Sequence, residues 1–334
     1  MAIRKAKSKA ASAKEIGYQE HGAVGPAESP SRTRGPGPAY ALETCGTTDV
    51  GLVRDGNEDA MLLSEEERLY VVADGMGGHS AGEVASAFTI EALRAFYGNA
   101  DLTKRVQAAY RRMRRAGHPI PEGEASHHAL RLRKAVESAN ITVYRLAQQH
   151  EQLRDMGTTV VAAVFAGRNL HIANVGDSRL YRLRDRRLTQ LTEDHSLLNE
   201  YLRMNLLQPD EVETFPYKNV IVRALGLQEA VAVDIFGFTV RRGDAYLLCS
   251  DGLTDLVRDL EIGAVMGQAP TALAACTRLT DLAKSRGGHD NITTLVVRVH
   301  EPEWQPPVPM IPPPPSGLAP GMIPPPPSGP APVD

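Results

Sequence analysis

Long hydrophobic runs are missing from this chain of 334 residues. No stretch approaches the roughly 18 consecutive apolar residues that a membrane-spanning helix needs. The first residues, MAIRKAKSKAASAKE, are basic but lack the apolar core of a secretory signal. We therefore expect a soluble protein without a membrane partner.

Cysteine is also scarce, because the chain has only Cys45, Cys249 and Cys276. Their odd number, wide spacing and lack of a CxxC pair speak against a disulfide framework and against a zinc knuckle. This usage suits a reducing compartment. We expect the protein to be cytoplasmic.

Neither sign of charge dominates, since 37 Lys and Arg against 40 Asp and Glu give a formal net charge of −3. Such a chain has no general attraction to nucleic acid or to an anionic membrane. Aromatic residues, at 5%, are too few to suggest stacking on single-stranded bases. The sequence predicts no nucleic-acid partner.

Both ends of the chain are poor in large apolar side chains. Residues 1–42 are mainly small, polar or Pro, cannot bury a core, and are predicted to be disordered. Residues 302–334 are proline-rich, carry MIPPPPSG twice, and should be extended polyproline II. This second tail is either a ligand for a proline-reading domain or a solvated extension. Residues 43–301 are expected to form one domain.

Short β-branched runs bounded by Gly, Asp or Asn predict strands at 69–73, 160–166, 170–175, 245–250 and 293–299. The stretch 169–183 predicts a hairpin that turns at Gly176 and Asp177. Three helices follow from apolar residues at helical spacing. Their faces are Val84, Phe88, Ala92 and Ala95 after His79; Leu132, Val136, Ala139, Val143 and Leu146; and Ala272, Cys276, Leu279 and Ala283. Strands that cluster apart from helices indicate the α+β class.

Four aspartates lie at the ends of predicted strands. Antiparallel pairing about Glu66 and Glu67 brings Asp59 and Asp74 to one sheet edge. Asp251 follows the run 245–250 and Asp290 precedes the run 293–299, so these two meet at one edge if the strands are antiparallel neighbours. Two half-sites of two aspartates each can then face each other.

Crowded carboxylates repel one another unless cations neutralise them or protons bind. Oxygen ligands without clustered His or Cys favour Mg²⁺ or Mn²⁺ over Zn²⁺. Two such ions about 3.5–4 Å apart can share a water molecule and lower its pKa. The glycines after Asp74 and Asp251 allow close backbone approach. The alternative is that each aspartate only forms a turn.

These segments closely resemble the phosphatase 2C family of metal-dependent Ser/Thr protein phosphatases, in particular its compact bacterial branch. The segments are GLVRDGNEDA (51–60), VVADGMGGHSAGEVAS (71–86), MGTTVVAAVFAG (156–167), ANVGDSRLYRL (173–183), LTEDHS (191–196), RALG (223–226), LCSDGLTD (248–255) and GGHDNITTLVV (287–297). The resemblance covers most of residues 43–300 in order and spacing. It implies a sandwich of two antiparallel β-sheets flanked by α-helices on both sides.

The resemblance also implies metal ligands. Asp74 would bridge two ions, and Gly75 would add its backbone carbonyl. Asp251 and Asp290 would complete the ligands of one ion. The remaining acids implied are Glu58 and Asp59 for the other ion, directly or through water, and Asp155 for a third ion, unless Asp155 only caps a turn.

Arg54 lies four residues before Glu58 and matches the family arginine that holds the substrate phosphate, a task that suits a guanidinium fork. The alternative is a surface arginine. Met76 departs from the eukaryotic members, which carry there a histidine that protonates the leaving group. His79 should not inherit that role, and His195 is either a second candidate or a packed or capping histidine. Residues 200–222 match the family's mobile flap only loosely.

The resemblance thus implies hydrolysis of phosphoserine and phosphothreonine in proteins by a water that bridges two Mn²⁺ or Mg²⁺ ions. No cysteine lies in a phosphate-binding loop, so no phosphoenzyme is expected. The expected partners are phosphorylated proteins, including a Ser/Thr protein kinase and its substrates, and the expected state is a monomer. Two alternatives are a catalytically idle regulator that binds phosphoproteins with the same fold, and a signalling phosphatase selective for one partner.

Overall fold

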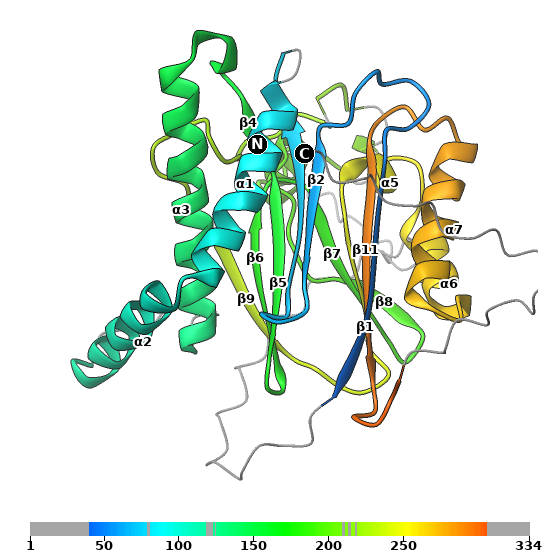
Figure 1. Ribbon diagram of the computed structural model, residues 1–334. Helices are drawn as coiled ribbons and strands as arrows, with labels where there is room; N and C mark the ends of the chain where they lie inside the picture. The colour runs from blue at the N-terminus through cyan, green and yellow to red at the C-terminus, as the bar shows by residue number, and fades with distance from the viewer. Residues whose placement is uncertain are drawn as a thin grey trace, which may run out of the picture. The chain divides into compact units, whose positions relative to one another are not determined.

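Two antiparallel β-sheets lie face to face, and helices cover the outer side of each sheet (Figure 1). The computed structural model describes residues 40–78, 81–117, 123, 125–208, 211–212, 215–217 and 219–305, all within one compact unit. The predicted α+β sandwich is confirmed. No helix in this part of the chain is both long and apolar enough to cross a membrane.

The first sheet has the strand order β1-β11-β10-β7-β8 and the second the order β2-β3-β5-β6-β9. In the first sheet these strands are β1 (Ala41–Asp49), β7 (Arg179–Arg184), β8 (Arg187–Gln190), β10 (Ala245–Cys249) and β11 (Ile292–His300). In the second they are β2 (Asp59–Ser64), β3 (Leu69–Met76), β5 (Val160–Ala166), β6 (Asn169–Val175) and β9 (Asp234–Thr239), with the short β4 (Gly157–Thr158) paired to β3. Four of the five predicted strand runs lie within these strands, and the run 245–250 exceeds β10 by one residue, Ser250.

Two helices cover the second sheet, α1 (Ala81–Gly98) and α3 (His127–Gln149), while α2 (Ala100–Arg115) projects from their lower end (Figure 1). On the side of the first sheet lie α5 (Asp251–Thr254), α6 (Asp259–Gln268) and α7 (Ala272–Ser285). The 3-10 helix η1 (Glu151–Leu153) and α4 (Leu197–Arg203) lie in the connections. The predicted apolar faces of α3 and α7 are confirmed, because their members are buried, except for the half-buried Leu146.

Strand residues alternate between two apolar layers. Leu69 and Val71 of β3 pack among residues of α1 and α3, whereas Tyr70 and Val72 pack in the layer between the sheets. Because both faces of the central strands are buried, these strands are apolar almost throughout. Tyr40, just before β1, is also buried in the inter-sheet layer. The sheets are therefore held in register by a continuous core that ends where the polar strand ends begin.

The hairpin predicted for residues 169–183 is wrong. β6 belongs to the second sheet and β7 to the first, so the chain crosses between sheets at Gly176. Gly176 has φ 107°, and a Cβ there would lie 2.6 Å from the Cβ of Thr159. Only glycine permits this crossing. It delivers Asp177 to the same sheet edge as the four predicted aspartates.

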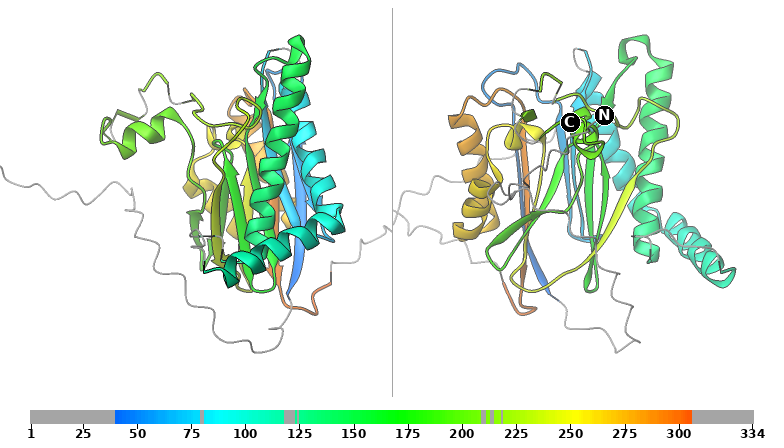
Figure 2. Two further views of the ribbon diagram at one scale, coloured as in Figure 1. Left: turned by 90° about the vertical axis from the view of Figure 1, so that its left-hand side faces the viewer. Right: turned by 180° about the vertical axis from the view of Figure 1, so that it is seen from behind.

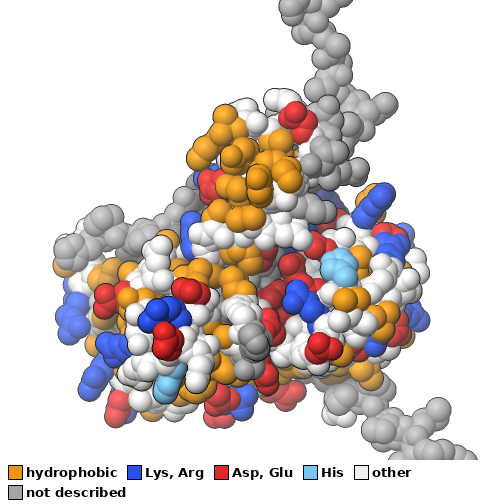
Figure 3. Space-filling model, turned by 90° about the horizontal axis from the view of Figure 1, so that it is seen from above, with side chains coloured by type: hydrophobic (Ala, Val, Ile, Leu, Met, Phe, Trp, Pro, Cys, Tyr) orange, Lys and Arg blue, Asp and Glu red, His pale blue; other side chains and the backbone are white. Residues whose placement is uncertain are grey.

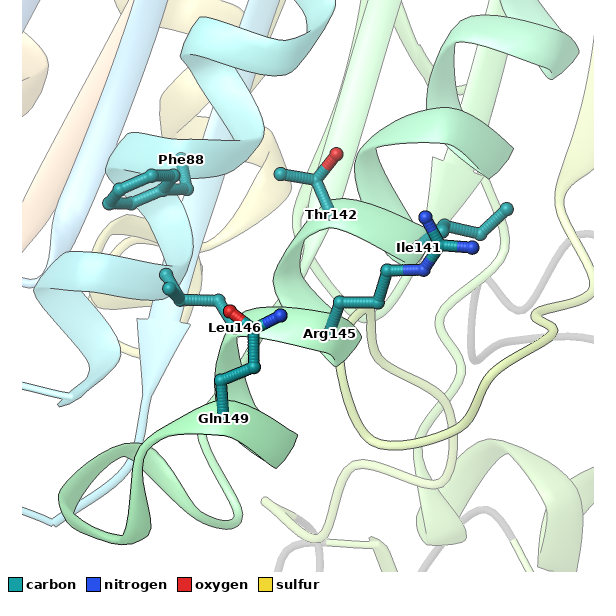
Figure 4. A pocket seen from close by; sticks show the side chains of 6 residues that line it. All are labelled: Phe88, Ile141, Thr142, Arg145, Leu146 and Gln149. Carbon is teal, nitrogen blue, oxygen red and sulfur yellow. The ribbon is translucent and has the colours of Figure 1, made fainter.

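The predicted apolar face of α1 is confirmed only in part, because Val84 and Ala92 are half-buried and pack against the core, whereas its other two members are exposed. Phe88 is 44% exposed and Ala95 is exposed. The helix instead buries a neighbouring stripe that includes Ile90, Leu93 and Phe96, whose larger apolar area decides the orientation. Phe88 lines a shallow surface pocket with residues of α3, namely Ile141, Thr142, Arg145, Leu146 and Gln149 (Figure 4).

Candidate active site

Asp59 and Asp74 lie directly opposite each other, because β2 and β3 pair in the register Asp59↔Asp74. The predicted pairing about Glu66 and Glu67 is confirmed. The backbone N–H of Asp74 donates to Thr159 Oγ1 (3.0 Å), and the Thr158 hydroxyl donates to the Asp74 carbonyl (2.9 Å). The backbone at Asp74 is therefore fixed before any ligand binds.

The second half-site forms as predicted where β10 and β11 pair antiparallel, with Cys249 opposite Thr294. Asp251 begins α5 and Asp290 precedes β11. Ser250 joins the two half-sites, because its hydroxyl donates to Asp59 Oδ2 at 2.7 Å. The side chains of the two sheets thus meet at one edge.

Burial dominates the electrostatics of these acids. Burial, with the charges of Asp251 and Asp290 adding to it, raises the pKa of Asp59 to about 7. Burial raises the pKa of Asp251 to about 6 and that of Asp74 well above its ordinary value, to which Asp59 and Asp251 add. Each of these carboxylates needs a proton or a cation nearby.

Asp177 is a further acid of this centre that the sequence did not reveal as a site residue. Its Oδ1 atom is buried without a hydrogen-bond partner in the structure. Burial, followed by the charges of Asp251 and Asp194, raises the pKa of Asp177 to about 8. Its position at a strand end was the available signal, but the hairpin interpretation treated it as a turn former.

Glu58 and Gly75 lie where β3 meets the start of α1. The N–H of Gly75 donates to the Glu58 carbonyl (3.1 Å), and a Cβ at Gly75 would lie 2.1 Å from the carbonyl oxygen of Gly82. A Cβ at Gly82 would lie 2.6 Å from Glu58 Oε2. Burial raises the pKa of Glu58. Glycine at both positions lets the Glu58 carboxylate reach the backbone beside Asp74.

Asn291 holds the loop that carries Glu58, a role that no sequence pattern indicated. Its Oδ1 accepts from the Glu58 N–H at 2.7 Å. Its Nδ2 donates to the carbonyls of Val50 (3.0 Å) and Gly56 (2.9 Å). Asn291 therefore ties the segment before β2 to the start of β11.

Arg54 lies beside these acids, and its side chain is 51% exposed. Its Nη2 donates to Asp290 Oδ2 at 2.8 Å. That hydrogen bond, with the nearby charges of Asp290, Glu58 and Asp74, raises the pKa of Arg54. A half-exposed guanidinium at the rim of a carboxylate cluster can accept an incoming anion.

The donor set fits hard divalent cations, because the buried acids provide oxygen atoms and burial makes their charged forms costly. No three acidic, His or Cys side chains of the described residues converge into a closed ligand set. The fit therefore rests on donor chemistry and burial. Asp155 is exposed, has a left-handed backbone (φ 66°), and makes no side-chain hydrogen bond or ion pair with the described residues.

Residues 53–285 match the family model for protein phosphatase 2C. The chain belongs to the protein phosphatase 2C family. It is 37% identical over 253 residues to the serine/threonine phosphatase stp of Listeria monocytogenes. The aligned residues make up 75% of this chain and 93% of that protein. It is 36% identical to the PstP phosphatase of Mycobacterium tuberculosis over 77% of this chain and 45% of PstP. The chain is therefore a serine/threonine protein phosphatase.

Solved structures of the family agree with this fold. The M. tuberculosis PstP/Ppp crystal structure superposes with a TM-score of 0.67 at 34% identity, covering 78% of this chain and 100% of that one. A PstP catalytic domain in complex with two manganese ions superposes with a TM-score of 0.64 at 35% identity and with the same coverage. Stp1 of Staphylococcus aureus gives 0.66 at 33% identity over 80% of this chain and 98% of its own.

The structure shows the surroundings of His195, the candidate for the histidine that protonates the leaving group. His195 is buried, and its Nδ1 accepts from the Gly176 N–H at 3.0 Å. Its Nε2 lies 3.1 Å from Asp234 Oδ2, which also pairs with Arg223. These contacts favour the packed alternative. His79 lies outside the described residues.

We expect His195→Ala to destabilise the protein without removing a catalytic proton donor. The buried Gly176 N–H loses its acceptor, which costs about 2–4 kcal/mol, and the melting temperature should fall by roughly 4–12 °C. The pH dependence of kcat should keep its alkaline limb. His150→Ala, at an exposed position, is the control. An unchanged melting temperature with a lost alkaline limb would instead make His195 the general acid.

The segment matched loosely to the flap carries exposed apolar side chains next to the acidic centre. Seen from above, apolar side chains gather on a projection beside an acidic hollow (Figure 3). The exposed members in this segment are Met204, Leu206, Tyr217, Val220 and Val222. The rings of Tyr201 and Phe215 pack against each other in a tilted arrangement, with centroids 5.1 Å apart and an interplanar angle of 49°.

Proposed function

We propose that this phosphatase hydrolyses phosphoserine and phosphothreonine in proteins at a centre for two Mn²⁺ or Mg²⁺ ions. The observation that supports the proposal most directly is the junction of the two half-sites through Asp59 and Ser250. The residues that would hold the ions are Glu58, Asp59, Asp74, Gly75 through its carbonyl, Asp251 and Asp290, with Asp155 for a third ion. When bound, the ions would supply charge neutralisation and lower the pKa of a shared water.

The chain's own side chains would bind the phosphate and hold the metal ligands in place. Arg54 would bind two phosphate oxygens and orient the phosphorus for in-line attack. Asp290 now accepts from Arg54, so a cation on Asp290 would release the guanidinium for the phosphate. The hydroxyl of Ser250 and the amide of Asn291 would hold Asp59 and Glu58 in place.

Arg54→Ala should raise KM for a phosphopeptide by roughly 10–100-fold and lower kcat by less, because the lost contact binds substrate and transition state alike. The KM of Arg54→Lys should lie between those of wild type and Arg54→Ala, because Lys keeps the positive charge but lacks the forked guanidinium group. Stability should change by no more than about 0.5 kcal/mol, given the exposure of the side chain. Steady-state kinetics give both constants. Kinetics equal to wild type would leave Arg54 a surface residue.

Release of inorganic phosphate from a phosphothreonine peptide, with and without added Mn²⁺ or Mg²⁺, tests the proposal. We expect no release after chelation and recovery on adding metal. The idle-regulator alternative predicts that the peptide binds but no phosphate appears under any metal condition. A phosphatase selective for one partner would release phosphate from that protein far faster than from the peptide.

We propose residues 43–301, together with Tyr40 and the start of β1, as the catalytic domain. Residues 306–334 of the proline-rich tail lie outside the described residues. We propose the tail as a ligand for a proline-reading domain. We further propose that the enzyme is a monomer whose partners are a Ser/Thr protein kinase and the substrates of that kinase. A chain trimmed to 38–305 should keep its melting temperature and peptide turnover. A large fall in either quantity would mean that a tail contributes to the folded enzyme.

A further inference from the structure

The helix α2 concentrates positive charge in a chain whose net charge is negative. Six of its sixteen residues are Lys or Arg, and one, Asp101, is acidic. The whole chain carries a formal charge of −3. The six cations, here called the arginine face, are Lys104, Arg105, Arg111, Arg112, Arg114 and Arg115.

The helix separates its apolar and charged sides. Leu102 and Val106 pack against the core beneath α1 and α3. The Tyr110 hydroxyl donates to the Ala125 carbonyl. All six cations of the arginine face are exposed. The apolar side is thus engaged within the domain, and only the charged side faces outward.

Among the described residues, only Asp101 forms an ion pair with the arginine face. Lys104 lies 3.4 Å from Asp101, and none of the five arginines forms an ion pair with a described residue. Elsewhere arginines are paired, as in Arg131 with Glu67 (3.1 Å) and Arg184 with Asp244 (2.7 Å). Cations in the last turn interact favourably with the helix dipole, which accounts for the last three arginines. Dipole stabilisation does not account for Lys104, Arg105 and Arg111, so the full cluster fits an external anion.

The arginine face lies far from the catalytic centre. α1 begins at Ala81, its second residue Gly82 lies beside Glu58, and its far end leads directly into α2. Its 18 residues span roughly 27 Å. In both views of Figure 2, α2 lies at the end of the domain opposite the start of α1, and the right-hand view shows it projecting from the domain. A ligand on α2 therefore cannot be the phosphate that is being hydrolysed.

The chemistry of the arginine face indicates which kind of partner can bind it. No large apolar side chain accompanies the cations on the outward side, so nothing can insert into a bilayer. No exposed aromatic ring accompanies them, so bases cannot stack. Arginine forks suit carboxylate and phosphate oxygens in bidentate geometry. A flexible chain rich in Glu, Asp or phosphorylated residues satisfies all three conditions.

We propose that the arginine face docks an acidic or multiply phosphorylated segment of the phosphoprotein substrate, remote from the phosphate that is hydrolysed. This proposal rests on the proposed function. Docking there would raise the effective concentration of the scissile phosphate at the catalytic centre. It would lower KM for substrates whose acidic segment lies far enough from the target residue to span α1.

The test compares two peptides with the full chain and Mn²⁺. One is a short phosphothreonine peptide, and the other carries in addition about 20 Gly/Ser residues, whose r.m.s. span is about 25 Å, and then six Glu. We expect KM to be about 10-fold lower for the extended peptide near 0.05 M salt, with kcat unchanged. The advantage should disappear near 0.5 M salt, where screening is strong.

The variant Arg105→Gln, Arg111→Gln, Arg112→Gln should abolish the advantage and keep the KM of the short peptide. Gln is also a good helix former, so α2 should persist. The control Arg145→Gln, Arg241→Gln, Arg278→Gln removes the same charge from exposed positions and should keep the advantage. An equal KM for both peptides, or loss of the advantage in both triple variants, would overturn the proposal.

Binding without turnover separates this proposal from the proposed function. A fluorescent hexaglutamate peptide should bind wild type, by anisotropy, at least 5-fold more tightly than the α2 triple variant. Tighter binding of polyuridylate or of phosphatidylserine vesicles, lost in the same variant, would overturn the acidic-segment proposal. Failure to hydrolyse the short peptide would reject the proposed function while leaving the binding result valid.

Discussion

Asp74→Asn is expected to lower phosphate release by at least about 10³-fold, which corresponds to about 4 kcal/mol of transition-state stabilisation. Asp74 belongs to the first half-site, and besides burial the charges of Asp59 and of Asp251 in the second half-site raise its pKa. As the proposed bridging ligand it would serve both ions, so the neutral amide weakens both. The metal-free variant should be at least as stable as wild type, because a costly buried charge is removed.

Asp244→Asn provides the matched control, since Asp244 is another buried aspartate. It accepts from Arg184 Nε at 2.7 Å and from the Tyr246 hydroxyl at 2.8 Å, away from the catalytic centre. Its replacement should cost about 3–5 kcal/mol of stability and leave kcat unchanged at temperatures where the variant is folded. Asp74→Asn with full turnover, or with a loss of stability like that of Asp244→Asn, would contradict the assignment.

Removal of divalent metal should make stability fall as pH rises. Burial raises the folded-state pKa of Asp251, Asp59 and Asp177 to about 6, 7 and 8, whereas the unfolded carboxyl groups titrate near 3.9. Between these values the folded state binds more protons than the unfolded state. The stability from these groups is therefore present at low pH and lost as pH rises through about 6 to 8.

Added Mn²⁺ should reverse this trend, because cations replace the protons. At 100 times its dissociation constant a single ion stabilises by about 2.7 kcal/mol, or roughly 5–10 °C in melting temperature for a domain of this size. Melting curves at pH 5.5 and pH 8, with chelator or with Mn²⁺, provide the measurement. A Mn²⁺ shift that is equal at both pH values would mean that the buried acids do not exchange protons for metal.

The catalytic aspartate pairs could be predicted because each depends on one antiparallel strand pair. The polar turn SEEER joins two short adjacent strands, and antiparallel pairing about its middle places Asp59 opposite Asp74. The pairing of β10 with β11 joins segments far apart in sequence, yet their long apolar runs marked both as buried strands. Because these two strands are neighbours, the acids at their ends lie at the same edge of the sheet.

The features that were missed depend on tertiary packing. The pattern of residues 169–183 is that of a hairpin, and only the close contact of Gly176 with Thr159 sends β7 to the other sheet. Two apolar stripes compete on α1, and the packing of α3 against it selects the one that leaves Phe88 exposed. α2 has no fully buried residue, so its apolar signal was too weak to predict a helix. Asn291 and Ser250 act through individual side-chain hydrogen bonds, and such bonds leave no periodic pattern in the sequence.

The count of Mn²⁺ ions bound per chain, measured by equilibrium dialysis together with turnover of a phosphothreonine peptide on the same samples, tests the central claim most directly. The two-ion centre predicts at least two ions per chain at saturation, with turnover rising only as the second ion binds. Asp74→Asn should bind at most one ion tightly and remain inactive. Full turnover at one ion per chain or fewer would contradict the two-ion account.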